Sequence, residues 1–198
     1  MTGPILIPTR SRAGIGRGKS SGGTLQYCLP GCVIIGTSTF VLTASNDYYA
    51  PFFLETPIEV DQIGFNLTVG ASSSNIRMGL YACDEYWQPI GPPLADSGNL
   101  DASTTGTKTY APSVPIFLPP GRYLTVLNAS ASVTVRHYRG LVPGSPTSHG
   151  NLSSGELIAG FIGRSYAAFP TPGTRWDSEV LSATPGWRHP ILLRIVGL

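Results

Sequence analysis

The residues nearest the N-terminus that could bind a phosphate are a lysine and a serine within a glycine-rich stretch. Gly18, Lys19 and Ser20 follow Ala13 at the spacing of a relaxed phosphate-binding loop. Such a loop needs a strand before it and a helix after it, because backbone N–H groups at the helix N-terminus hold the phosphate. Residues 21–30 are rich in glycine and β-type residues and predict no helix. We therefore interpret the match as a coincidence and expect no nucleotide or other cofactor.

No arrangement of serine, histidine or acidic residues predicts catalysis or a metal site. Ser97 follows an aspartate and precedes a glycine, but the G-x-S-x-G turn of a hydrolase nucleophile is missing, so a β-turn is expected. His137, His149 and His189 are scattered, and no two of them stand at a metal-ligand spacing. We therefore expect a non-enzymatic protein with no catalytic residue and no metal.

The pairing of the three cysteines is left open. Cys28 and Cys32 flank a Leu-Pro-Gly turn that would bring them close, while Cys83 is distant in the sequence. This spacing is poor for zinc, and nothing in the sequence argues for an oxidising compartment. Free and largely buried thiols are the expected state.

Two segments combine aromatic rings with acidic neighbours in a way that suits a carbohydrate. Tyr86 and Trp87 follow two acidic residues, and Arg175 and Trp176 lie just before two more. An aromatic ring stacks on the apolar face of a sugar while carboxylates accept hydrogen bonds from its hydroxyls. The same residue types also anchor protein cores and protein–protein interfaces. These four residues are candidates for glycan binding, with a core or interface role as the alternative.

Basic residues are concentrated at the start of the chain. Four of the 13 basic residues precede the first acid, Asp47, and the other nine stand against 11 acids, which leaves the rest of the chain about two charges negative. Residues 1–23 are glycine-rich and predict an extended arm that docks on a neighbouring protein. Nucleic-acid binding is the weaker alternative, because four charges lack interleaved aromatic residues. The predicted assembly residues of the arm are Ile5, Leu6, Ile7, Arg10, Arg12, Arg17 and Lys19.

The composition favours β-structure. Glycine and proline account for 24 and 18 of the 198 residues, and charged residues make up only 12%. Lysine is limited to Lys19 and Lys108, so good helix formers for exposed faces are scarce. β-branched, aromatic and turn residues are abundant instead. A surface this poor in charge is also expected of a protein that is partly buried against other subunits.

Several short runs alternate apolar and polar residues, as half-buried strands do. In residues 58–69 the alternation slips by one position at Asp61 and Gln62, which predicts a β-bulge. Residues 122–129 are apolar on both faces and predict a central strand, with residues 133–135 as its hairpin partner. Further strands are expected at residues 76–82 and 191–196, a long loop at residues 84–93, and either a helix or a strand at residues 157–162.

Turns separate the predicted strands roughly every 8–12 residues, a spacing typical of sandwiches and barrels. This spacing predicts an all-β fold. We expect an antiparallel β-sandwich of jelly-roll-like form with an extended N-terminal arm. Residues 1–45 are assigned to the arm, although residues 24–43 fit either strands or extended chain lying on a partner. Residues 46–198 are assigned to the sandwich domain.

Residues 58–68 and 76–81 resemble a β-sandwich module of bacteriophage tail, fibre and minor virion structural proteins. The similarity spans residues 48–198 and includes the segments 94–98, 101–106 and 118–124, the last of which leads from Leu-Pro-Pro-Gly into a core strand. It consists of packing and turn signals without a catalytic signature, and it carries over no functional residue. The segment 84–93 departs from the resemblance, because the family commonly has a short turn there.

The resemblance implies a structural component of a bacteriophage particle, such as a tail, fibre, spike or head-decoration protein, assembled in the host cytoplasm. Its implied partners are other virion proteins of the capsid, neck or tail and further copies of the same chain, often as a trimer. A carbohydrate-binding module that recognises a host surface glycan is the alternative. No signal peptide or membrane helix is expected, because no apolar run approaches about 18 residues.

Overall fold

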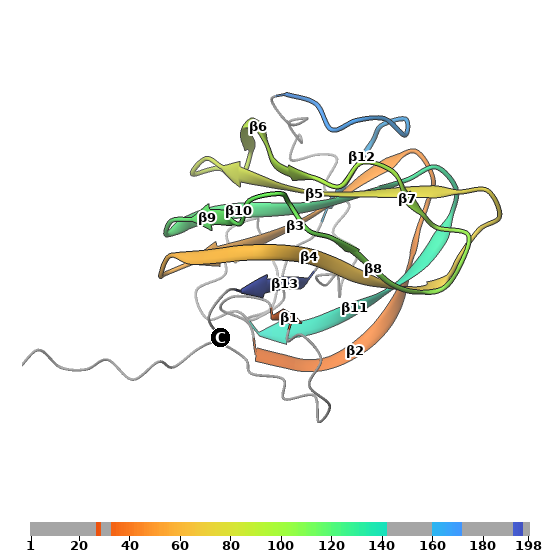
Figure 1. The fold of residues 1–198 in the computed structure, drawn as a ribbon, viewed down its shortest axis with the longest axis horizontal. Coiled ribbons are helices and arrows are strands. Elements are labelled where there is room, and N and C mark those ends of the chain that lie inside the picture. Colours follow the sequence, from red (N-terminus) through yellow and green to blue (C-terminus); the bar gives the residue numbers. More distant parts are fainter. Residues whose placement is uncertain (1–26, 29–32, 142–159, 172–191, 196–198) are drawn as a thin grey trace, which may run out of the picture.

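The computed structural model describes residues 27–28, 33–141, 160–171 and 192–195. These residues form two antiparallel sheets that pack face to face, and they contain no helix (Figure 1). One sheet contains β1 (Tyr27–Cys28), β2 (Val33–Leu42), β4 (Ile58–Val69), β8 (Gly106–Tyr110), β9 (Ile116–Leu118), β11 (Val133–Leu141) and β13 (Leu192–Ile195). The other contains β3 (Asn46–Leu54), β5 (Asn75–Cys83), β6 (Pro89–Asp96), β7 (Leu100–Asp101), β10 (Gly121–Ala129) and β12 (Gly160–Gly163). The predicted all-β class with antiparallel sheets is confirmed.

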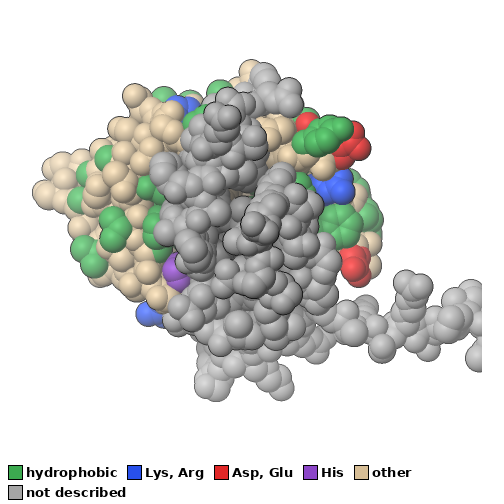
Figure 2. Space-filling model, turned by 180° about the vertical axis from the view of Figure 1, so that it is seen from behind, with side chains coloured by type: hydrophobic (Ala, Val, Ile, Leu, Met, Phe, Trp, Pro, Cys, Tyr) green, Lys and Arg blue, Asp and Glu red, His purple; other side chains and the backbone are tan. Residues whose placement is uncertain are grey.

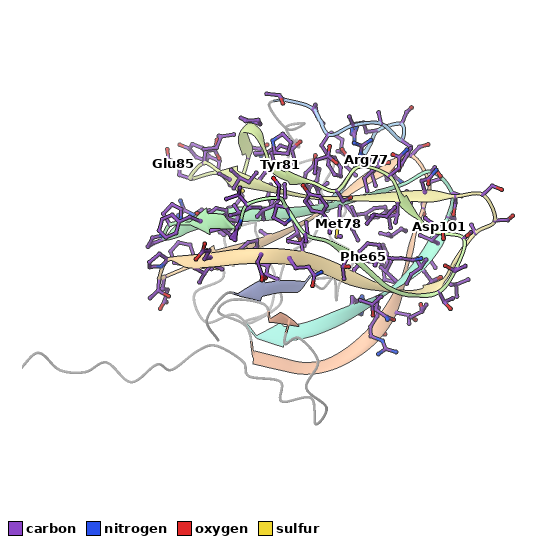
Figure 3. The ribbon with its side chains drawn as sticks, in the orientation of Figure 1. Phe65, Arg77, Met78, Tyr81, Glu85 and Asp101 are labelled. Carbon is purple, nitrogen blue, oxygen red and sulfur yellow. The ribbon has the colours of Figure 1, made fainter. Side chains whose placement is uncertain are left out.

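The main core lies between the two sheets. Alternate side chains of β4 and β5, among them Phe65 and Met78, point inward and are buried, as the alternation in the sequence predicts (Figure 3). Burying each side chain of this size contributes roughly 1.5–3 kcal/mol, so the sandwich folds mainly by closing this interior.

The bulge predicted in β4 is confirmed. In the pairing with β13, Gln62 lies opposite Arg194 and Val60 lies opposite Ile195, so Asp61 is the extra residue. The bulge allows Val60 and Ile63 both to be buried in the main core, although three positions separate them.

The central strand predicted at residues 122–129 is also confirmed, but its predicted hairpin partner is wrong. β10 lies between β3 and β5 and is buried on both faces. β11 pairs instead with β2 and β4 in the other sheet, so the chain crosses between the sheets at residues 130–132. Local alternation identifies a strand, whereas its partner is chosen by long-range packing.

Three other segments differ from or refine the sequence prediction. The loop expected at residues 84–93 ends at residue 88. The proline-containing strand β6 begins at Pro89 and lies at the edge of its sheet. Residues 160–163 adopt the strand alternative. Residues 33–42, within the stretch assigned to the arm, form β2, and Leu42 belongs to the main core. The jelly-roll connection and the extended arm stay predictions.

A short segment covers the outer face of the six-stranded sheet. Residues 160–171, which we call the strap, start with β12 beside β3 and then cross toward β6 (Figure 1). A second apolar cluster lies between the strap, the sheet and the loop before β6, and it consists of Tyr49, Tyr81, Trp87, Leu124, Val126 and Phe169. The six-stranded sheet is therefore buried on both faces over this area.

Candidate functional site

The strap is attached to the sheet by a buried ionic network. Asp47 is fully buried and accepts hydrogen bonds from Asn128 Nδ2 at 2.6 Å and from Arg164 Nη2 at 2.9 Å, while Arg164 Nε donates to its other oxygen. Burial disfavours the charged guanidinium, but the hydrogen bond and charge of Asp47 outweigh this effect and raise the pKa of Arg164. The guanidinium of Arg164 therefore stays charged, and its hydrogen bonds to Asp47 fix the start of the strap.

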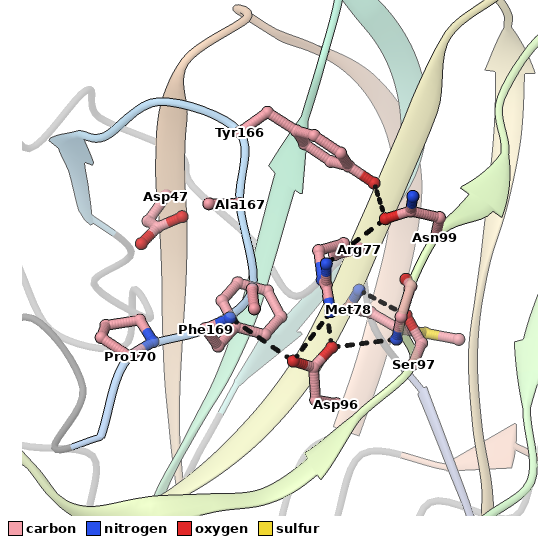
Figure 4. A network of polar contacts seen from close by, with 12 residues as sticks. Asp47, Arg77, Met78, Asp96, Ser97, Asn99, Tyr166, Ala167, Phe169 and Pro170 are labelled. Carbon is pink, nitrogen blue, oxygen red and sulfur yellow. Dashed lines mark hydrogen bonds and ion pairs between the residues drawn. The ribbon is translucent and has the colours of Figure 1, made fainter.

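A second ion pair holds the other end of the strap, as Figure 4 shows. Arg77 Nε and Nη2 each donate to one oxygen of Asp96 at 3.2 Å. Asp96 also accepts a hydrogen bond from the backbone N–H of Phe169, and Asn99 Oδ1 accepts from both Arg77 and Tyr166. The ion pairs of both networks join the strap to the sheet, which is the arrangement of a structural attachment.

The surface best placed to meet a ligand lies at one end of the sandwich, where three connections come together. These are the β3–β4 turn (residues 55–57), the β5–β6 loop (residues 84–88) and the β9–β10 turn (residues 119–120). Strand register brings them to the same end, because Gly121 lies opposite Leu54 and Tyr123 lies opposite Ala82. We call this surface the aromatic end and define it by Phe53, Glu55, Glu59, Asp84, Glu85, Tyr86, Ile90, Phe117 and Arg122.

The β5–β6 loop is closed by its first residue. The carboxylate of Asp84 accepts hydrogen bonds from the backbone N–H groups of Tyr86 at 2.9 Å and Gln88 at 2.8 Å. Trp87 adopts a positive φ of 62°, which turns its side chain inward, and the Arg122 guanidinium lies 5.5 Å from the centre of its ring. Trp87 is therefore 6% exposed, while Tyr86 beside it is 66% exposed.

Exposed aromatic rings gather at this end. Among the described residues, Phe53, Tyr86 and Phe117 are the exposed aromatic side chains, and all three belong to the aromatic end. Phe53 lies on the outer face of the six-stranded sheet opposite Arg122, and Phe117 lies on the other sheet opposite Glu59. Figure 2 shows hydrophobic and acidic side chains around a basic one at this end, on the right of the view.

Seven of the acidic residues in the described segments, all except Asp61, fall into two groups. Asp47, Asp96 and Asp101 form ion pairs with Arg164, Arg77 and Lys108. By contrast, Glu55, Glu59 and Glu85 are exposed and form no ion pair with the described residues, and all three lie at the aromatic end. With Asp84 they give this end four carboxylates beside the guanidinium of Arg122. Figure 3 labels Glu85 at this end and Asp101 at the opposite end.

This combination of groups is suited to binding a ligand. Aromatic faces attract cations and apolar groups, and unpaired carboxylates attract cations and hydroxyl groups. The nearby Cys83 is a free thiol, and burial together with the charge of Asp84 raises its pKa well above the ordinary range, so it stays protonated. Within the described segments no group of three or more histidine, cysteine and acidic residues is arranged to hold a metal ion.

Of the residues predicted for glycan binding and for assembly, the structure describes Tyr86 and Trp87. Tyr86 offers an exposed ring, whereas Trp87 is buried against Arg122 and the second apolar cluster. Arg175 and Trp176 lie outside the described residues, as do all seven predicted assembly residues, Ile5, Leu6, Ile7, Arg10, Arg12, Arg17 and Lys19.

Sequence reasoning missed two of the three exposed aromatic residues. Phe53 and Phe117 stand in apolar runs that look like ordinary strand sequence. A signal existed for Phe117, because it alternates with the inward-facing Ile116 and Leu118 and so must point outward. Its neighbour Glu59 alternates with Ile58 and Val60 in the same way.

Comparisons with protein-family models, with curated proteins and with solved structures found no match to this chain. The resemblance to virion modules therefore stays a prediction from the sequence. The described part of the chain contains no helix of the length and apolar character needed to cross a membrane.

Proposed function

We propose that this chain is a non-enzymatic structural component of a virus particle, of the kind found in bacteriophage tails, fibres, spikes or head decorations. In this proposal an extended arm within residues 1–45 anchors the protein to capsid, neck or tail proteins. A jelly-roll-like sandwich is displayed, in several copies such as a trimer, on a particle assembled in the host cytoplasm. The main support is the aromatic end, because clustered exposed aromatic residues are typical of protein contact surfaces.

Charge distribution and composition support the same proposal. The arm carries four basic residues and no acid, whereas the rest of the chain is slightly acidic. An arm that is free before assembly gains order only on its partner, which allows it to reach across a subunit boundary.

Deletion of residues 1–23 tests this function. We expect the shortened protein to keep the sandwich, because the described main core starts at Leu42, but to be lost from purified particles. Circular dichroism would check the fold, and quantitative mass spectrometry of particles would measure incorporation. Incorporation at the wild-type level by the shortened protein would rule the proposal out.

Carbohydrate recognition is the second candidate, favoured by the exposed ring of Tyr86 beside the unpaired carboxylate of Glu85. We expect any glycan ligand to stack on Tyr86, so Tyr86→Ala should abolish binding on a glycan array. Trp87→Ala would act through loss of packing and lower the melting temperature instead. Absence of binding to host envelope preparations would count against this candidate.

A further inference from the structure

We infer that the aromatic end is the docking surface for the basic arm, residues 1–23, of a second copy of the chain. This inference rests on the proposed function, since it names the partner that the arm would contact. It requires the arm and the surface to be complementary in charge and in apolar character. Both requirements can be examined residue by residue.

The charges are complementary. Among the described residues, Glu55, Glu59 and Glu85 are exposed at the aromatic end without an ion pair, whereas Asp47, Asp96 and Asp101 each have an arginine or lysine within 4 Å. The arm offers Arg10, Arg12, Arg17 and Lys19 and contains no acid. An unpaired cluster of one sign attracts an oppositely charged segment and excludes segments of its own sign.

The apolar groups are complementary as well. Phe53, Tyr86 and Phe117 present exposed rings, which attract arginine side chains through cation–π contacts and also bury aliphatic groups. Arg122 already lies over Trp87 in this way, so the end contains one example of the contact. The arm combines its basic residues with an aliphatic triplet, residues 5–7.

The reach of the arm is sufficient for a neighbouring molecule. The arm joins the body at β1, where Tyr27 pairs with Arg194 of β13. At about 3.3 Å per extended residue, 23 residues span up to roughly 75 Å, well beyond the length of one strand. Docking on a second copy forms a head-to-tail contact, which propagates from one molecule to the next or closes into a ring.

Two complementary full-length variants test the inference. The arm variant carries Arg10→Glu, Arg12→Glu, Arg17→Glu and Lys19→Glu, and the end variant carries Glu55→Lys, Glu59→Lys and Glu85→Lys. Sedimentation velocity of nuclease-treated protein should show association of the wild type and monomers for each variant alone. An equimolar mixture should associate again, because the unchanged arm of the end variant meets the unchanged end of the arm variant, and the acidic arm meets the basic end.

The mixture separates docking on a second copy from docking on the same molecule. If the two variants remain monomeric when mixed, or if the wild type is monomeric, the inference is overturned. Loss of wild-type association on nuclease treatment would show that nucleic acid bridges the arms, which also overturns it. If Tyr86→Ser and Phe117→Ser leave association unchanged, the aromatic end is not the surface involved.

A matched control places three new lysines at the opposite end of the sandwich. Val69→Lys, Ser72→Lys and Thr105→Lys all change exposed residues there, and association should persist at the wild-type level. Failure of this inference and failure of the proposed function are distinguishable. If deletion of residues 1–23 prevents incorporation into particles while the mixed variants stay monomeric, the arm anchors the protein to a different partner.

Discussion

At the scale of single residues, Asp47 is the carboxylate that we expect to contribute most to stability, because the strap covers it. Asp47 is fully buried, and its partner Arg164 retains 17% side-chain exposure. An ion pair in this position has lost most of its hydration, so each charge depends on the other. Asp101 is the contrasting case, because it is 59% exposed and its oxygen lies 3.8 Å from Lys108.

We therefore expect Asp47→Ala to lower the free energy of unfolding by about 3–5 kcal/mol, because the guanidinium of Arg164 and the amide of Asn128 would lose their common acceptor. Urea denaturation followed by tryptophan fluorescence would measure the change. Asp101→Ala is the exposed control: it removes a surface ion pair and hydrogen bonds from Ser103 and Thr104, and it should shift the midpoint less, since water replaces exposed contacts of this kind. Equal stability of Asp47→Ala and the wild type would contradict this account.

At the scale of elements, the strap packs on β5 so closely that only glycine fits beneath it. A Cβ atom at Gly79 would lie 2.8 Å from Phe169 Cδ2 and 2.9 Å from the carbonyl oxygen of Ala95. The absence of a side chain thus sets the distance between strap and sheet.

Gly79→Ala should destabilise the protein by roughly 1–3 kcal/mol, because the added methyl group overpacks this contact. The cost should be smaller in a Phe169→Ala background, where one of the two close contacts is gone. Gly121→Ala is the matched control, since its nearest neighbour atom would be 3.7 Å away. Thermal unfolding of the four variants and the wild type gives the coupling, and strictly additive effects would disprove the direct contact.

The strap is also expected to loosen at alkaline pH. Burial, and then the negative charge of Asp47, raise the pKa of Tyr81 above its ordinary value, and the Tyr81 hydroxyl donates a hydrogen bond of 2.7 Å to the carbonyl of Pro170. The folded state therefore keeps this proton at a pH where the unfolded state has lost it. The stabilisation by Tyr81 is fully present below the pKa that this residue has in the unfolded state. It declines as the pH rises above that value.

The free energy of unfolding should fall as the pH rises above about 10, the ordinary pKa of tyrosine, and Tyr81→Phe should reduce the slope. The variant should also lose about 1 kcal/mol at neutral pH with the hydrogen bond. Urea titrations at a series of pH values would supply both numbers. An unchanged slope in Tyr81→Phe would assign the alkaline effect to other groups.

At the scale of the whole molecule, the sequence places basic residues within positions 1–23, and the structure places exposed carboxylates and aromatic rings at the aromatic end. Such an arrangement favours association between copies and makes it depend on ionic strength. Charged residues make up only 12% of the chain, so few other charged contacts between copies compete with this one.

Association of the full-length protein should weaken when salt is raised from about 0.05 M to about 0.5 M, because the Debye length falls below the reach of exposed charge pairs. Sedimentation equilibrium across this range would measure the change in dissociation constant. Association that strengthens with salt would indicate an apolar interface without the inferred charge pairing.

The sequence alone determined the features that depend on neighbours along the chain. The two-residue period of strands identified β4 and β5, a run that is apolar on both faces identified β10, and the slip in the period located the bulge at Asp61. These predictions succeed because consecutive side chains alternate between the faces of a strand whatever its partner. The uneven distribution of basic residues was likewise visible without coordinates.

Only the tertiary structure decided which strands pair and which aromatic residues face solvent. β11 follows β10 in the sequence but pairs with β2 in the other sheet. The strap places Arg164 beside Asp47, which is 117 positions away in the sequence. Two adjacent aromatic residues also differ in exposure. Trp87 has a positive φ, and its ring is buried against the guanidinium of Arg122, whereas the ring of Tyr86 is exposed. Such outcomes depend on the packing of segments that are distant in the sequence, and the local period of a strand contains no information about them.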